Sequence, residues 1–469
     1  MKLPLESEFE LAKDRKKKDV GKSDAPSNKN QTHKNSADGA SQPKKTRIGF
    51  IIIAVAVVIV IIGFLGKGSL RSYCITLAKD RLSKFEYTQA IEALEFTEDW
   101  QVDNDEVHFL KARIYRKLGK FDEFEKSLAQ SRTLGLDESK AEYEKLLLGG
   151  QSGRIAELLN KLEELVGGVH QFDPAEVYEA LVNGFLLHGR VVEATEYVEN
   201  WKKDYPEDPS QKFYEAVMLI RYGPIQRIEG AQEKAASILE KLVSAYPSYF
   251  RARMTYGDLL FELNQVEKSA EQFENCIKNP DAGMQPKLSL ARCYANLGRT
   301  EDAKKMFEQV LEETPDNNLA LSELGKLQLA DEEFDLALKN LQAAFPSRRW
   351  DMDLNNDLGQ ALQANGRAED AKPYFDRAEV IREKRGEIQQ LMEELDQGFR
   401  DEEKRFELGK LLLEYGNPEH GVLYLRSVLD VNPRHRGAFQ ALQNHFATQQ
   451  KTNPRLNFRE ASPQSQNLN

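Results

Sequence analysis

The sequence predicts an all-α chain: an α-solenoid of about ten helical hairpins that follows a single transmembrane helix. Two observations support this prediction. Residues 48–66 contain no charged side chain. The long segment after them repeats a pattern of small and large residues at a spacing of about 34 positions. Charged residues make up 30% of the chain, which is typical of helices with one exposed face.

The apolar segment reads IGFIIIAVAVVIVIIGFLG, and as a helix it is long enough to cross the roughly 30 Å of bilayer hydrocarbon. A buried core helix is one alternative, but no second segment of the chain is nearly so apolar. A cleaved signal peptide is another, but its apolar core is about 7–15 residues long and follows a short basic start. The segment therefore predicts a membrane anchor.

The charge distribution predicts the orientation of this anchor. Residues 1–47 carry twelve Lys or Arg against seven Asp or Glu, whereas the whole chain has a net charge of −11. Lys and Arg near an anchor favour the cytoplasmic side of the membrane. We therefore expect a single-pass membrane protein with a cytoplasmic N-terminus and an extracytoplasmic (periplasmic) helical domain.

The repeat is clearest in the unit that begins at Met284. Its pattern residues are Leu290, Ala291, Tyr294, Gly298, Ala303, Phe307 and Pro315. The next two units keep the small residues, as Gly325 with Ala337 and Gly359 with Ala371, although Gln328 replaces the expected aromatic residue. This pattern resembles the tetratricopeptide repeat (TPR) family, and with the anchor it resembles membrane-anchored bacterial TPR proteins.

The resemblance implies paired antiparallel helices that stack into a superhelix with a concave groove. We expect Gly359 to face Ala371 within one hairpin, and Gly325 to face Ala337, because small residues let two helices approach closely. The predicted order along the chain is a disordered basic tail at 1–47, the anchor at 48–66, a degenerate TPR-like array at 71–248, a central TPR array at 249–385, a long helix insert at 386–401, a last TPR with a cap helix at 402–446 and a disordered tail at 447–469.

Motifs of catalysis are missing from the sequence. It contains no phosphate-binding GxxxxGK[ST], no HExxH, no GxSxG and no CxxC pair. We therefore expect no enzyme activity, no cofactor, no metal and no small-molecule substrate. The acidic balance argues against nucleic acid as a partner. A disulfide between Cys276 and Cys293 stays open, beside their interpretation as small packing residues.

The expected partners are other proteins, bound as peptide segments or helices, together with the membrane at residues 48–66. In TPR arrays, positions 2, 5, 9 and 12 of each first helix line the groove. The residues that this rule selects for partner binding are Arg251, Asp258, Arg292, Lys326, Asn356, Gln360 and Gln363. Amides suit hydrogen bonding to an extended backbone, and the cations suit a carboxylate.

Two functions fit these expectations. The first is a membrane-tethered TPR scaffold that binds protein partners in cell-envelope assembly, secretion or chaperoning. The alternative is a non-catalytic accessory subunit of a membrane enzyme complex, such as one for cytochrome maturation or polysaccharide synthesis. A pull-down distinguishes them, because assorted clients favour the scaffold and one stoichiometric partner favours the subunit.

Overall fold

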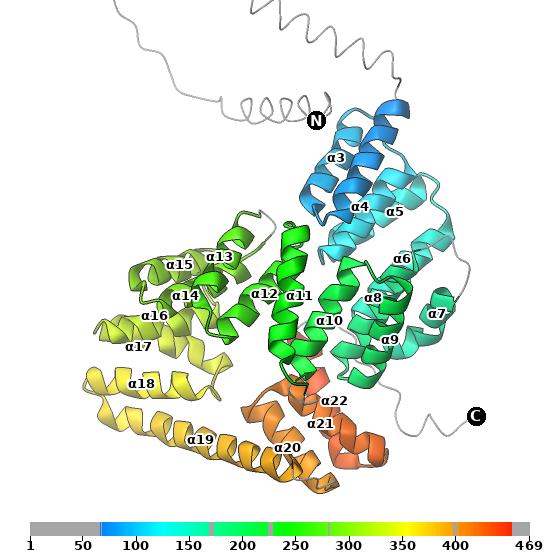
Figure 1. Cartoon of the computed structure of the whole chain (residues 1–469). Coiled ribbons are helices and arrows are strands. Elements are labelled where there is room, and N and C mark those ends of the chain that lie inside the picture. The colour runs from blue at the N-terminus through cyan, green and yellow to red at the C-terminus, as the bar shows by residue number, and fades with distance from the viewer. Residues whose placement is uncertain are drawn as a thin grey trace, which may run out of the picture. The chain divides into compact units, whose positions relative to one another are not determined.

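The computed structural model describes residues 66, 68–167, 173–223, 228–279, 282–396 and 401–452. All of them belong to one compact unit, Leu65–Asn469. No strand occurs in the described ranges, and the chain there is a series of helices (Figure 1). After a first helix within 68–83, these are α3 (Tyr87–Asp99), α4 (Asp105–Lys117), α5 (Phe121–Thr133), α6 (Glu138–Gln151), α7 (Ile155–Gly167), α8 (Pro174–Leu187), α9 (Val191–Asp204), α10 (Pro209–Tyr222), α11 (Ala231–Ala245), α12 (Phe250–Glu262), α13 (Val266–Ile277), α14 (Gln285–Asn296), α15 (Thr300–Glu313), α16 (Asn318–Ala330), α17 (Phe334–Ala344), α18 (Met352–Ala364), α19 (Ala368–Asp396), α20 (Glu402–Tyr415), α21 (Pro418–Val431) and α22 (Arg436–Thr452).

Consecutive helices pair into hairpins from α4/α5 to α20/α21, and α22 packs on the last of them. This arrangement confirms the predicted all-α solenoid. The helix α19 is 29 residues long, and its second half packs through Ile388 on Leu408 and Leu412 of α20. The final helix continues to Thr452, past the expected end of the cap helix at 446.

The predicted membrane localisation is wrong. Among the residues that the structure describes, no helix combines the length and the apolar character that a membrane crossing requires. This finding overturns the expectation of a single-pass protein with a cytoplasmic N-terminus and periplasmic repeats. The segment 48–66, on which that expectation was based, lies outside the described residues except for Gly66, as do the tails at 1–47 and 453–469.

The turn inside most hairpins contains one residue in the left-handed conformation. Six of these residues are glycines, Gly119, Gly153, Gly189, Gly230, Gly298 and Gly366. At the same place in other hairpins the chain has Phe85, Asn264 and Glu332, with φ of 61°, 58° and 62°. This conformation costs an L-residue about 1–2 kcal/mol, and packing in these three hairpins must offset that free energy.

Within a hairpin, the small residue of the first helix meets a large side chain of the second. A Cβ atom at Gly359 would lie 2.5 Å from Cε1 of Phe375, and one at Gly325 would lie 2.7 Å from Cγ of Leu341. The three atoms nearest to a Cβ at Gly359 all belong to Phe375, four residues after Ala371 in α19, so Phe375 is the side chain that lies closest to this glycine. At Gly325 the carbonyl oxygen of Ala337 is also near, at 3.3 Å. The glycines thus make room for aromatic and leucine side chains.

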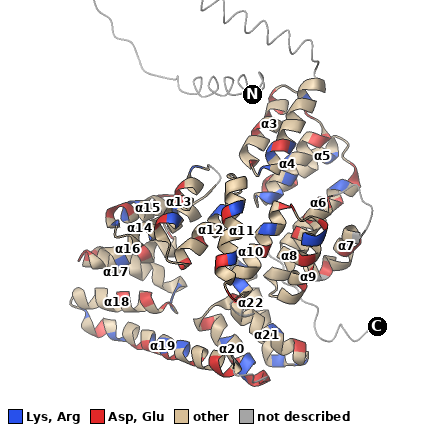
Figure 2. Ribbon diagram, in the orientation of Figure 1, with Lys and Arg blue, Asp and Glu red and all other residues tan. Residues whose placement is uncertain are grey.

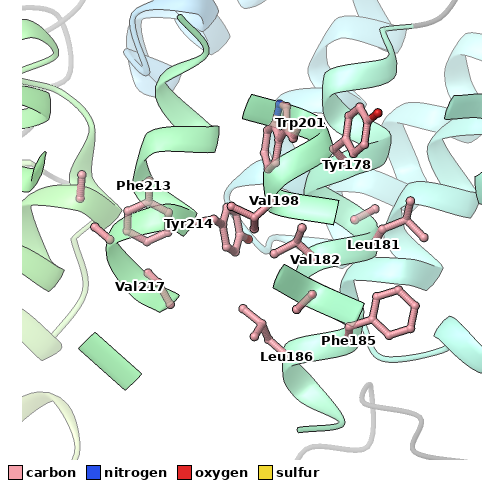
Figure 3. Packing of buried hydrophobic residues seen from close by; sticks show 14 of the residues in the cluster. Tyr178, Leu181, Val182, Phe185, Leu186, Val198, Trp201, Phe213, Tyr214 and Val217 are labelled. Atoms are coloured by element: carbon pink, nitrogen blue, oxygen red, sulfur yellow. The ribbon is translucent and has the colours of Figure 1, made fainter. Parts of the chain in front are cut away.

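The largest apolar core joins α6 to α12. Trp201 is fully buried there, and its ring stacks on Tyr178 with the ring centroids 6.1 Å apart (Figure 3). The indole N–H of Trp201 donates to Asp208 at 3.1 Å, so the buried polar atom keeps a partner. All three cysteines, Cys74 among them, are free and buried, so Cys276 and Cys293 act as packing residues.

Candidate functional site

The candidate site is the surface formed by the first helices of successive hairpins, here named the inner face. The helices α8, α10, α12, α14, α16 and α18 contact one another in this order along the chain. Residues with the same position in each repeat therefore form columns that run across several hairpins. Charges of both signs are interspersed along the helices (Figure 2).

In the N-terminal half, the inner face is filled by an ion-pair network, here named the charged cluster. Its members are Arg113, Arg116 and Lys117 of α4, Glu144 of α6, Glu176 and Glu179 of α8, and Arg251 of α12. Arg116 is central: its Nε lies 2.7 Å from Glu144 and its Nη2 lies 2.7 Å from Glu176. The side chains of Arg116 and Glu144 are completely buried.

The pKa values in the charged cluster show that its charges stabilise one another. Burial by itself raises the pKa of Glu176, yet Lys117, Arg113 and Arg116 together hold that pKa well below 4.5. The same holds for Glu179, where Lys117 and Arg251 outweigh the effect of burial on the pKa. Carboxylates that are paired in this way stay ionised at neutral pH. This part of the inner face is therefore occupied by side chains of the protein itself.

Phe85, in the turn before α3, packs against the segment just before α12. Its ring stacks on Tyr249, just before α12, with the centroids 3.7 Å apart and the planes within 4° of parallel. Phe85 also meets Tyr246 edge to face. These contacts explain why a bulky residue adopts a positive φ there, since the surrounding packing fixes it.

From α12 onward the inner face is accessible to solvent. One column contains Asp258, Arg292, Lys326 and Gln360, which follow one another at intervals of 34 residues and are all exposed. The guanidinium of Arg292 lies 5.1 Å from the centre of the Phe261 ring, which belongs to the preceding hairpin. This column, here named the polar ladder, joins four hairpins.

Two carboxyl groups of this surface have raised pKa values. Although Asp258 is exposed to solvent, partial desolvation by the protein atoms around it raises its pKa to about 6, and Arg292 only partly opposes this effect. Burial likewise raises the pKa of Asp357 in α18 to about 6, with Lys326 opposing and Asp353 adding to the effect. The two ladder cations therefore each lie in the field of a carboxyl group from a neighbouring hairpin.

The other residues selected from the sequence have different surroundings. Arg251 donates from Nη1 to Glu179 at 3.2 Å and from Nη2 to the Tyr214 hydroxyl at 3.2 Å, so it belongs to the charged cluster. Asn356 is half-buried on α18, whereas Gln363 is exposed one turn after Gln360. The partner-binding role of all seven residues stays a prediction.

The sequence interpretation missed the charged cluster, although a signal for it was present. Arg113 and Arg116 occupy positions 9 and 12 of their repeat, and Glu176 and Glu179 occupy positions 2 and 5 of theirs. The groove rule therefore selects opposite charges on different helices. In the described ranges, no group of three or more His, Cys, Asp or Glu side chains is arranged to hold a metal ion.

Family models match two parts of the chain. Residues 232–396 match the tetratricopeptide repeat-like domain, and residues 105–131 match the tetratricopeptide repeat. A curated relative, the TPR repeat-containing protein YpiA of Bacillus subtilis, is 26% identical over 154 residues. That match covers 32% of this chain and 36% of YpiA, so the chain spans little more than a third of its relative.

Parts of the chain are also similar to solved structures. PilW, described as a type IV pilus biogenesis factor, is 19% identical with a TM-score of 0.38, and the match covers 43% of this chain and 91% of PilW. A tetratricopeptide repeat protein from Parabacteroides merdae is 16% identical with a TM-score of 0.34, over 61% of this chain and 99% of its own. By the two family models, residues 105–131 and 232–396 are similar in sequence to tetratricopeptide repeats.

Proposed function

We propose that the chain is a protein-binding scaffold in which the inner face of α12, α14, α16 and α18 binds an extended segment of a partner. The observation that carries this proposal is the polar ladder. Its four side chains are exposed and evenly spaced, and each comes from a different hairpin. A linear ligand that crosses the hairpins would meet one rung after another.

The chemistry of the ladder selects the kind of segment. Gln360 and Gln363 each offer an amide N–H donor and a carbonyl acceptor, which suit the backbone of an extended peptide. Arg292 and Lys326 are consecutive cationic rungs, and an acidic side chain of the partner fits between them. Half-buried Phe261 and Leu329 supply apolar contacts beside the rungs.

The cellular setting that we propose is cell-envelope assembly, secretion or chaperoning, with a non-catalytic accessory subunit of an enzyme complex as the alternative. A pull-down with the full chain tests the two. Many unrelated clients support the scaffold, and a single stoichiometric partner supports the accessory subunit.

The site itself is tested by reversing the cationic rungs, as Arg292→Glu with Lys326→Glu. Lys305→Glu with Lys339→Glu is the matched control, because both lysines are exposed on the second helices α15 and α17 and the net charge changes equally. We expect the ladder variant to lose at least about tenfold in affinity for the captured partner. Placing like charges next to each other costs several kcal/mol, so even a partial effect reaches this loss. Equal affinities of the two variants at low salt, with native circular dichroism, would refute the assignment.

A further inference from the structure

The helices α21 and α22 pack on α8–α10, which lie far before them in the sequence. Arg426 of α21 donates from Nε to the carbonyl oxygen of His188 at 3.0 Å, 238 positions away. Nε2 of His420 lies 3.3 Å from the carbonyl oxygen of Arg221, 199 positions away. Figure 1 shows α21 and α22 beside α8–α10. This contact, here named the seam, does not follow from the 34-residue period.

The centre of the seam is buried and closely packed. His188, Val422 and Phe446 are only 2%, 4% and 3% exposed, and the rings of His188 and Phe446 lie 5.6 Å apart. A Cβ atom at Gly189, in the turn after α8, would lie 2.5 Å from Cγ1 of Val422, so the turn and the side chain meet without a gap. Leu423 of α21 packs on the core of α6–α12. The seam is therefore a permanent part of the fold.

The seam joins the two ends of a packed series of helices. Each hairpin from α10 to α18 contacts the next one, α19 packs through Ile388 on Leu408 and Leu412 of α20, and α20 pairs with α21. Because α21 then packs on α8–α10, the helices α8–α22 form a closed ring. In an open array each repeat contacts only its neighbours, so each junction can bend separately. In a ring, a bend at one junction must be compensated at another or must break the seam.

We propose that the seam is a clasp that holds α12–α18 at one curvature, so that the four rungs of the polar ladder have a fixed spacing before a partner binds. The ladder is exposed while the seam is closed, so binding needs no movement of α21 or α22. A spacing that is fixed in advance reduces the conformational entropy lost on binding and thereby raises affinity. This benefit rests on the proposed function, whereas the fixed curvature is a property of the free protein.

A wedge at Gly189 tests the clasp. In Gly189→Asn the new residue tolerates the left-handed φ of 67°, but its Cβ would overlap Val422 across the seam. The matched control is Gly298→Asn, because φ there is 72° and a Cβ would meet nothing within 4 Å. Spin labels on Lys268→Cys of α13 and Lys372→Cys of α19 report the curvature. Both positions are exposed on second helices, and the three native cysteines are buried.

Pulsed electron paramagnetic resonance measures the distribution of distances between the two labels. We expect one narrow distribution in the labelled parent chain and in the control, and a wider one in Gly189→Asn.

Hydrogen exchange reads the same wedge from the other side of the seam. The amides of α21 and α22 should exchange about tenfold faster in Gly189→Asn than in the control, a factor within the range of overpacking costs. Arg426→Ala removes only the hydrogen bond to His188 and should widen the distance distribution less. Equal widths in the parent chain and both seam variants, with native circular dichroism, would overturn the clasp. Because no partner is used, this outcome is independent of the Arg292 and Lys326 test.

Discussion

Replacing Gly359 by alanine tests how tightly the hairpin of α18 and α19 is packed. The new methyl carbon would lie 2.5 Å from both Cε1 and Cζ of Phe375, closer than carbon atoms approach without a shift. Alanine is the better helix former by about 0.5–1 kcal/mol, but overpacking costs about 1–3 kcal/mol. We therefore expect Gly359→Ala to lower the free energy of unfolding of this hairpin by about 1–2 kcal/mol.

The matched control is Gly386→Ala in α19, where a Cβ would meet nothing within 4 Å. The same helix propensity applies without the steric cost, so this variant should be more stable than the wild type by about 0.5–1 kcal/mol. The assay is native-state hydrogen exchange of the α18 and α19 amides, because repeat arrays unfold locally. If Gly359→Ala protects these amides as well as Gly386→Ala does, the packing argument fails.

Three further predictions concern the charged cluster, the inner face and a turn. Arg116→Met removes the cation that pairs with buried Glu144 and Glu176. The free energy of unfolding of the N-terminal half, measured with urea, should therefore fall by about 3–5 kcal/mol. A fall of less than about 1 kcal/mol would contradict a stabilising role of the charged cluster. The pKa of Asp357 is about 6 in the folded chain and about 3.9 when unfolded, so the contribution of this group to stability should fall as the pH rises from 4 to 6. Asp357→Asn should remove that contribution and gain stability relative to the wild type between pH 4 and pH 6, as urea midpoints of the two proteins at several pH values will show. Glu332→Gly relieves a positive φ at an exposed side chain and should raise the thermal midpoint through about 1 kcal/mol of stabilisation, whereas an unchanged or lower midpoint would mean that the turn is not strained.

The repeat register follows from the sequence because it depends on local geometry. A small residue, a tight turn and a second apolar helix recur at one spacing, and the structure begins α12 at Phe250, α14 at Gln285 and α16 at Asn318 accordingly. The period does not reveal which side chain fills the space beside each glycine. Phe375 reaches Gly359 because a large side chain covers a surface spot away from its own backbone.

The contacts that define the candidate site could not be obtained from the period. Glu179 and Arg251 are 72 residues apart, and they meet only because the intervening hairpins curve by a particular amount. The same holds for Phe85 with Tyr249 and for Arg426 with His188. Small rotations between hairpins add up over the array, and each depends on side-chain packing that a consensus pattern does not specify.

Arg251 is the residue at which the two halves of the inner face meet. Its guanidinium pairs with Glu179 on one side and lies over the rings of Phe213 and Tyr214, 5.0 and 5.6 Å from their centres. Before it in the chain, the cations of α4 pair with Glu144, Glu176 and Glu179 of other helices; seven residues after it, Asp258 begins the exposed ladder. The pair of Arg116 and Glu144 in the same cluster is completely buried and costly to separate, so it holds these helices of the N-terminal half together. The residues of the polar ladder are exposed instead, so their charged side chains remain able to pair with charges of a partner.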